Sequence, residues 1–217
     1  MSEQRTVVTI SRQMASGGVY IGRRVARKLG YKYVDREILE KAAEQLGADR
    51  AALAAVEERC SSFLDNLVKS FNFGTPEAAF VAPSGKPVYD REVFETESRV
   101  IKALADRYDC VVVGHAAFFV LRGRRNMVNV LIHAPEDFRI KRLQEFHKIS
   151  ADQARAEILN ADRQRDKFIR TMTKMEWQDA RNYHLSVNSQ AAGFENVENM
   201  IVGLVEKIKA DAACNGI

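Results

Sequence analysis

Several features that would point to particular classes of protein are missing from this sequence. A membrane-spanning helix needs a run of about 18 apolar residues, and the chain has none. The three cysteines are odd in number and widely spaced, so they form neither a disulfide framework nor a zinc-binding pattern. The four histidines show no HExxH or other metal-ligand spacing. The start of the chain lacks the apolar segment of a signal peptide, so we expect a cytoplasmic protein that does not contact membranes.

The chain also lacks a strong excess of charge of one sign. Its 33 basic residues are nearly balanced by 29 acidic ones, which leaves a net charge of +4. Nucleic-acid binding usually requires a concentrated basic face with aromatic side chains for stacking, and here acidic residues interleave with the arginines. This mild excess of positive charge suits a small anionic ligand, and we expect no nucleic-acid partner.

Strand-like and helical segments alternate along the chain. Alternation of this kind favours an α/β fold with a parallel sheet built from right-handed crossovers. The expected strands are residues 6–11, 31–35, 110–114, 128–134 and 184–188. The expected helices are residues 18–29, 36–46, 50–70, 91–108, 135–147, 151–170 and 195–210. We therefore predict a single domain over residues 1–217 with a five-stranded parallel sheet.

The stretch between the second and third expected strands is too long for one crossover. It covers about residues 36–109 and includes a loop at 72–90 that holds three of the four prolines. One interpretation is a helical cap that adds to the core, and the other is the acceptor side of a nucleotide kinase. The sequence leaves both open.

The first strand leads through a small, glycine-bearing loop into a helix. Main-chain amides converge at such a junction and the helix dipole adds positive charge, so the loop predicts a phosphate site. The P-loop pattern GxxxxGK[ST] is incomplete: Arg12 stands at its first glycine and Gly18 at its lysine. The candidate phosphate-binding residues are Ser11, Arg12, Gln13, Ser16, Gly17 and Gly18.

Other polar residues follow the expected strands, where ligands of open α/β sheets bind. Asp35 and Arg36 follow the second strand and His115 follows the third, so we take them as candidates for substrate binding. A charged stretch near 162–170 contains Arg163, Arg165 and Arg170. It predicts either a solvated, self-paired helix or a lid, over about 150–175, that brings cations to a phosphoryl group.

Taken together, these residues resemble the cytidylate kinase-like family of P-loop nucleoside monophosphate kinase relatives. The resemblance spans nearly the whole chain. It is carried by residues 10–13 with 16–18 and 21–22, 29–30 with 33–39, 111–114, 134–135 with Arg139, Asp162 with Arg165, and Trp177 with Tyr183 and Asn188. Relatives usually carry a charged pair where Val19 and Tyr20 stand, and tend to have arginine in place of His115.

The resemblance implies a three-layer P-loop kinase-like fold with a helical insert. It also implies ATP at the first loop, a Mg²⁺ ion bridging its phosphates, and transfer of the γ-phosphoryl group to a nucleoside monophosphate such as CMP. Arg163, Arg165 and Arg170 would then be the catalytic cations. Because the P-loop lysine is absent, a nucleotide-binding sensor with little or no turnover is the alternative.

Overall fold

The structure is a computed structural model that describes residues 5–35 and 91–214. Its five strands form one parallel sheet in the order β2-β3-β1-β4-β5. The strands are β1 (Val7–Arg12), β2 (Lys32–Val34), β3 (Cys110–Val113), β4 (Met127–His133) and β5 (Leu185–Asn188). All five expected strands are confirmed, and every end lies within one residue of the expected one, because each strand is a short β-branched run bounded by turn residues.

The helices between the strands follow the apolar periodicity. They are α1 (Gly18–Leu29), α4 (Arg91–Arg107), α5 (Ala117–Val120), α6 (Glu136–His147), α7 (Ala151–Thr173), α8 (Ser189–Ala192) and α9 (Phe194–Cys214), with a 3-10 turn at Ala180–Asn182. The two single-turn helices α5 and α8 were not expected from the sequence. The expected helices at 36–46 and 50–70 and the loop at 72–90 lie outside the described residues, so the insert stays a prediction.

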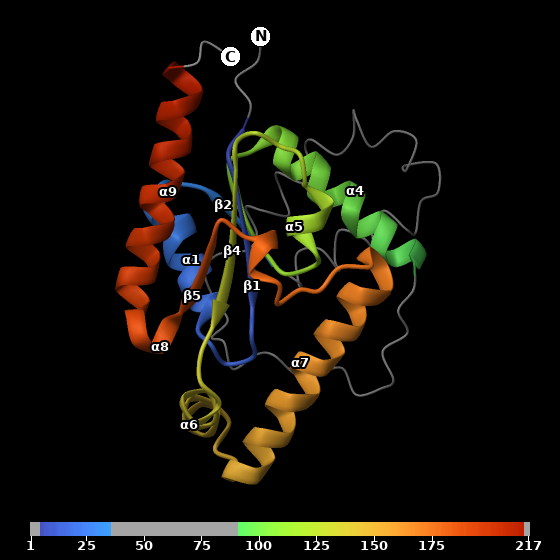
Figure 1. Cartoon of the computed structure of the whole chain (residues 1–217), viewed down its shortest axis with the longest axis vertical. Coiled ribbons are helices and arrows are strands. Elements are labelled where there is room, and N and C mark those ends of the chain that lie inside the picture. Colours follow the sequence, from blue (N-terminus) through green and yellow to red (C-terminus); the bar gives the residue numbers. More distant parts are fainter. Residues whose placement is uncertain (1–4, 36–90, 215–217) are drawn as a thin grey trace.

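Helices cover both faces of the sheet and make three layers (Figure 1). On one face, α1 and α9 pack on alternate strand residues such as Val8, Ile10 and Val111. On the other, α4 and α5 pack on Val7 and Val112. The α/β prediction is thus confirmed, with both faces of the parallel sheet buried as its continuous apolar runs require. Among the described helices, none is both long and apolar enough to cross a membrane.

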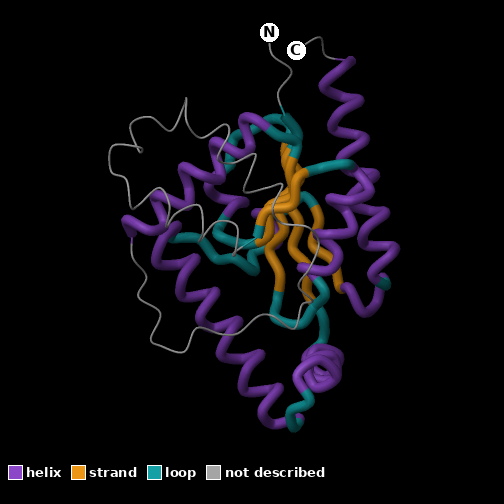
Figure 2. Tube along the Cα trace, turned by 180° about the vertical axis from the view of Figure 1, so that it is seen from behind, coloured by secondary structure: helices purple, strands orange, loops and turns teal. Residues whose placement is uncertain are grey.

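The central strand β1 points its carboxyl end at α6 and α7, which lie beyond the sheet (Figures 1 and 2). β1 pairs with β3 from Val7 to Ile10 and with β4 from Val7 to Arg12. A small apolar cluster joins Met14 and Ala15 of the following loop to Leu143 of α6 and Ile158 of α7. The long helix α7 is therefore packed directly against the loop that the sequence singles out.

Candidate phosphate-binding site

The loop between β1 and α1 is built for tight turning. Gly17 has φ 87°, in the left-handed region where a side chain is strained, and it precedes the first residue of α1. The Phe194 ring lies on Gly17: a Cβ atom there would come within 2.7 Å of the ring's Cζ atom. Residue 17 must therefore be glycine for two reasons: its backbone is in the left-handed region, and the Phe194 ring leaves no space for a side chain.

Two of the predicted loop residues hold the loop in place through their side chains. Ser16 is fully buried and its hydroxyl donates to the carbonyl oxygens of Gln13 and Ile132, at 2.9 and 3.1 Å. The Gln13 side-chain oxygen accepts a hydrogen bond from the amide of Ala134 at 3.1 Å. These bonds tie the loop to the end of β4, so its main-chain amides are fixed before any ligand arrives.

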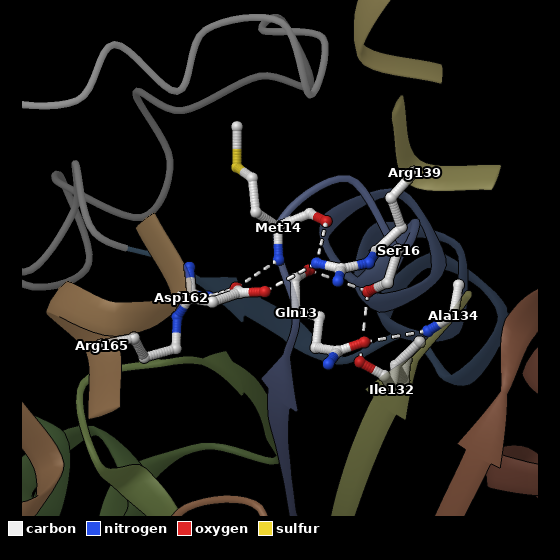
Figure 3. A network of polar contacts seen from close by, with 8 residues as sticks. All are labelled: Gln13, Met14, Ser16, Ile132, Ala134, Arg139, Asp162 and Arg165. Carbon is white, nitrogen blue, oxygen red and sulfur yellow. Dashed lines mark hydrogen bonds and ion pairs between the residues drawn. The ribbon is translucent and has the colours of Figure 1, made fainter. Parts of the chain in front are cut away.

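Asp162 of α7 connects the loop to two arginines (Figure 3). Its Oδ1 atom accepts hydrogen bonds from the Met14 amide at 2.9 Å and from Nη1 of Arg165 at 2.8 Å. Its Oδ2 atom accepts from Nη1 of Arg139 at 2.6 Å, and Arg139 also donates to the Met14 carbonyl. The loop amide at Met14 therefore already binds an anionic oxygen, supplied by the protein itself.

Positive side chains gather around Asp162. Burial, followed by the positive charge of Arg12, lowers the pKa of Arg165 to about 9, while Asp162 opposes that shift. The Arg165 guanidinium also lies over the Trp177 ring, 5.4 Å from its centre. Three arginines, Arg12, Arg139 and Arg165, thus act on one another around a single carboxylate in a partly desolvated place. Such an arrangement favours an anion.

The candidate residues for substrate binding lie on the other side of β1. Asp35 follows β2 and forms an ion pair with Arg23 of α1 at 3.5 Å. His115 follows β3, and its Nδ1 atom lies 3.0 Å from a carboxylate oxygen of the buried Glu97 on α4. His115 and Ala116 both have φ 54°, a strained conformation that is concentrated at functional sites. The third candidate, Arg36, lies outside the described residues.

The three arginines predicted for the lid do not lie together. Arg165 reaches the loop through Asp162, whereas Arg163 is exposed and Arg170 pairs with Asp166 and Glu176 at the surface. Helical periodicity explains the difference, because Arg165 lies on the stripe that also buries Ala161. A charged pair that interrupts an apolar stripe is the signal that separates Asp162 and Arg165 from their neighbours.

Some residues at the site are absent from the candidates drawn from the sequence. Arg139, which is buried on α6, and its partner Asp162 belong to the residues that carry the family resemblance, but neither was a candidate site residue. Arg142 donates to the Ala15 carbonyl at 3.1 Å, and its guanidinium lies 4.6 Å from the centre of the Phe194 ring. Both arginines lie on the first two turns of α6, one turn apart, which places them on a common face.

The fit of the site to a metal ion is weaker than its fit to phosphate. In the P-loop pattern a hydroxyl after the lysine binds Mg²⁺, and here that position is Val19. Over residues 5–35 and 91–214, no three acidic, histidine or cysteine side chains come together as a metal site. Any Mg²⁺ would be held mainly by the phosphates of a nucleotide and by water.

A parallel sheet with a fixed, amide-bearing loop between its central strand and a helix is typical of α/β proteins that bind phosphate groups. A comparison with protein families narrows this class. The cytidylate kinase-like family matches residues 7–191, and the chain belongs to that family.

Solved structures of similar fold share little sequence with the chain. An uncharacterized protein from Eubacterium ventriosum ATCC 27560 has 16% identity and a TM-score of 0.70, with 93% of this chain and 99% of that chain covered. A shikimate kinase from Bacteroides thetaiotaomicron has 16% identity and a TM-score of 0.49, with 93% and 98% covered. A gluconokinase from Sinorhizobium meliloti 1021 has 10% identity and a TM-score of 0.47, with 96% and 98% covered. No curated protein matches the sequence.

Proposed function

We propose that the chain is a phosphotransferase that uses ATP with Mg²⁺ and transfers the γ-phosphoryl group to a nucleoside monophosphate, such as CMP, or to a similar small phosphorylated acceptor. The bond between the γ-phosphorus and the bridging oxygen breaks, and a bond to an acceptor phosphate oxygen forms. Such an oxygen is ionised at neutral pH, so no general base is needed. Mg²⁺ would neutralise the phosphates of the nucleotide.

One observation carries the proposal: the Met14 amide already binds an anionic oxygen between two arginines. The Asp162 carboxylate occupies this place, with Arg139 and Arg165 on its two oxygens. A phosphate oxygen has the same charge and accepts the same hydrogen bonds. Arranging cations around the phosphoryl group is most of the catalysis in this class of reaction, so these arginines suit the transfer as well as the binding.

The acceptor would lie on the β2 and β3 side of the loop. The Asp35–Arg23 pair and the His115–Glu97 pair bound this side, and Arg12 extends toward it from β1. The charges are of both signs, which suits an acceptor with a phosphate and hydrogen-bonding groups. We infer that Asp35 and His115 contact the acceptor rather than ATP.

The second candidate, a nucleotide sensor with little turnover, is favoured by the two missing groups of the P-loop pattern. Gly18 and Val19 replace its lysine and its metal-binding hydroxyl. Such a sensor would bind ATP through the loop amides and release it unchanged.

A phosphotransfer assay against a panel of monophosphates separates the two functions. We expect the purified protein to convert ATP and one monophosphate to ADP and a diphosphate. Arg165→Gln should lower this turnover about 100-fold, as loss of one charge-stabilising donor commonly does. The exposed Arg163→Gln is the matched control. Tight ATP binding without transfer to any acceptor would instead identify the sensor.

A further inference from the structure

Gly18, the residue at the lysine position, has no conformational reason to be glycine. It begins α1, and it is not among the described glycines with positive φ. The reason is the space around it. A Cβ atom at Gly18 would lie 2.5 Å from Cβ and 2.8 Å from Cγ of Arg12. Any side chain at residue 18 would collide with the Arg12 side chain.

The far end of the same arginine lies beside a second glycine, Gly114, whose φ of 86° already favours glycine. A Cβ atom at Gly114 would lie 2.3 Å from Nη1 of Arg12. The Arg12 side chain therefore starts at the end of β1, passes the first residue of α1 and reaches the loop after β3. Its charge also acts on Arg165 of α7, so the guanidinium lies among the loop, the lid helix and the acceptor side.

We propose that the cation and the first glycine of the P-loop have exchanged places in this chain, so that Arg12 contacts the nucleotide phosphates in place of the missing lysine. Arg12 occupies the glycine position of the pattern and Gly18 the lysine position. The collision at Gly18 shows that the two changes depend on each other, because a lysine at 18 needs the space that Arg12 fills. The identity of the ligand rests on the proposed function, whereas the exchange itself does not.

A double-mutant cycle tests the exchange without any ligand. Gly18→Ala should lower the urea midpoint of the protein that has Arg12, because the methyl group collides with the Arg12 side chain. In the Arg12→Gly background the same Gly18→Ala change should leave the midpoint equal or higher, since alanine favours the helix. Equal effects in both backgrounds would show that the two sites are independent and would overturn the exchange.

Binding of ATP with Mg²⁺, measured by calorimetry, tests the role of Arg12. Arg12→Gln should weaken binding at least tenfold, whereas Arg27→Gln, which removes the same charge from the exposed side of α1, should not. The double variant Arg12→Gly/Gly18→Lys should recover most of the affinity that Arg12→Gly loses. Wild-type affinity in Arg12→Gln, or no recovery in the double variant, would overturn the proposal.

A measurement of ATP binding to the wild-type protein shows which of the two proposals fails. If it fails to bind ATP, the proposed function is wrong, and the double-mutant cycle alone decides whether the exchange has occurred. If it binds ATP and Arg12→Gln binds equally well, the proposed function stands and Arg12 is not the phosphate cation.

Discussion

Two Asp–Arg pairs on α7 have the same chemistry and different surroundings. Asp162 and Arg165 face the loop, with side chains 15% and 14% exposed. Asp166 and Arg170 face solvent, with side chains 39% and 55% exposed. Burial makes the inner pair costly to disrupt, and in the proposed function this pair acts on the bound phosphate, whereas water screens the outer pair. The position of a charged pair on the helix thus decides its role.

Removal of the carboxylate charge should give the largest difference between the pairs. Asp162→Asn leaves Arg139 and Arg165 buried without a counter-charge, so we expect the free energy of unfolding to fall by about 3 kcal/mol. Asp166→Asn is the matched control and should change it by less than about 0.5 kcal/mol. Urea unfolding measures both. Similar losses in the two variants would mean that the inner pair is no more important than the outer one.

Replacement of the arginine by glutamine should reduce activity much more in the inner pair than in the outer pair. With ATP and the acceptor found in the panel, we expect Arg165→Gln to lower kcat/KM about 100-fold, because it removes a charge from the phosphoryl group in transfer. Arg170→Gln should stay within about twofold of the wild type, as expected for a screened surface pair. A strong loss in Arg170→Gln would show that the outer face of α7 reaches the reacting groups.

A lysine in place of Arg165 should make ATP binding depend more strongly on pH. The site lowers the pKa of Arg165 to about 9, with burial as the largest cause. An unperturbed lysine has a pKa of about 10.4, already below that of arginine, and the same burial would lower it further. Since the lowered pKa means that the charge is lost as pH rises, Arg165→Lys should bind ATP less tightly at pH 9 than at pH 6.

The wild type should lose less affinity over that range, and calorimetry at several pH values gives both curves. A flat profile for Arg165→Lys would mean that the lysine stays charged, and the inner face would then be less desolvated than the structure indicates.

Loss of the N-terminal cap of α7 should change the difference between the two pairs least, because the cap stabilises the whole helix and both of its faces alike. The Ser150 hydroxyl accepts a hydrogen bond from the Gln153 amide, and the Gln153 side chain accepts one from the Ser150 amide. Ser150→Ala should lower the free energy of unfolding by about 1 kcal/mol. The ratio of Arg165→Gln to Arg170→Gln activities should be the same with and without the cap. A changed ratio in this background would show that the cap affects one pair only.

The sequence predicts the fold of the described residues well because each strand is a compact apolar run with turn residues at its ends. The same holds for the position of the loop between β1 and α1, which follows from strand, glycines and helix in succession, whereas its binding of phosphate stays a prediction. Helical periodicity also groups Arg163, Lys167 and Arg170 on one face, and the structure places that face in solvent. The apolar stripe that includes Ala161 marks the inward side of α7 and so the direction of Asp162 and Arg165, but local spacing does not show that this side meets the loop after β1.

The exchange of Arg12 and Gly18 illustrates a second limit of the sequence. The pattern shows that the lysine is missing, but it does not show what occupies its space. That answer needs the path of one side chain past two glycines, Gly18 and Gly114, that are 96 residues apart in the sequence. Glycines that are far apart along the chain and adjacent to the same arginine become recognisable only in three dimensions.

A crystal structure with a non-hydrolysable ATP analogue and Mg²⁺ tests the central claim most directly. We predict that a phosphate oxygen replaces the Asp162 carboxylate at the Met14 amide and that Arg12 and Arg165 both lie within hydrogen-bond distance of the triphosphate. A triphosphate bound elsewhere, with Asp162 still on the Met14 amide, would contradict the account.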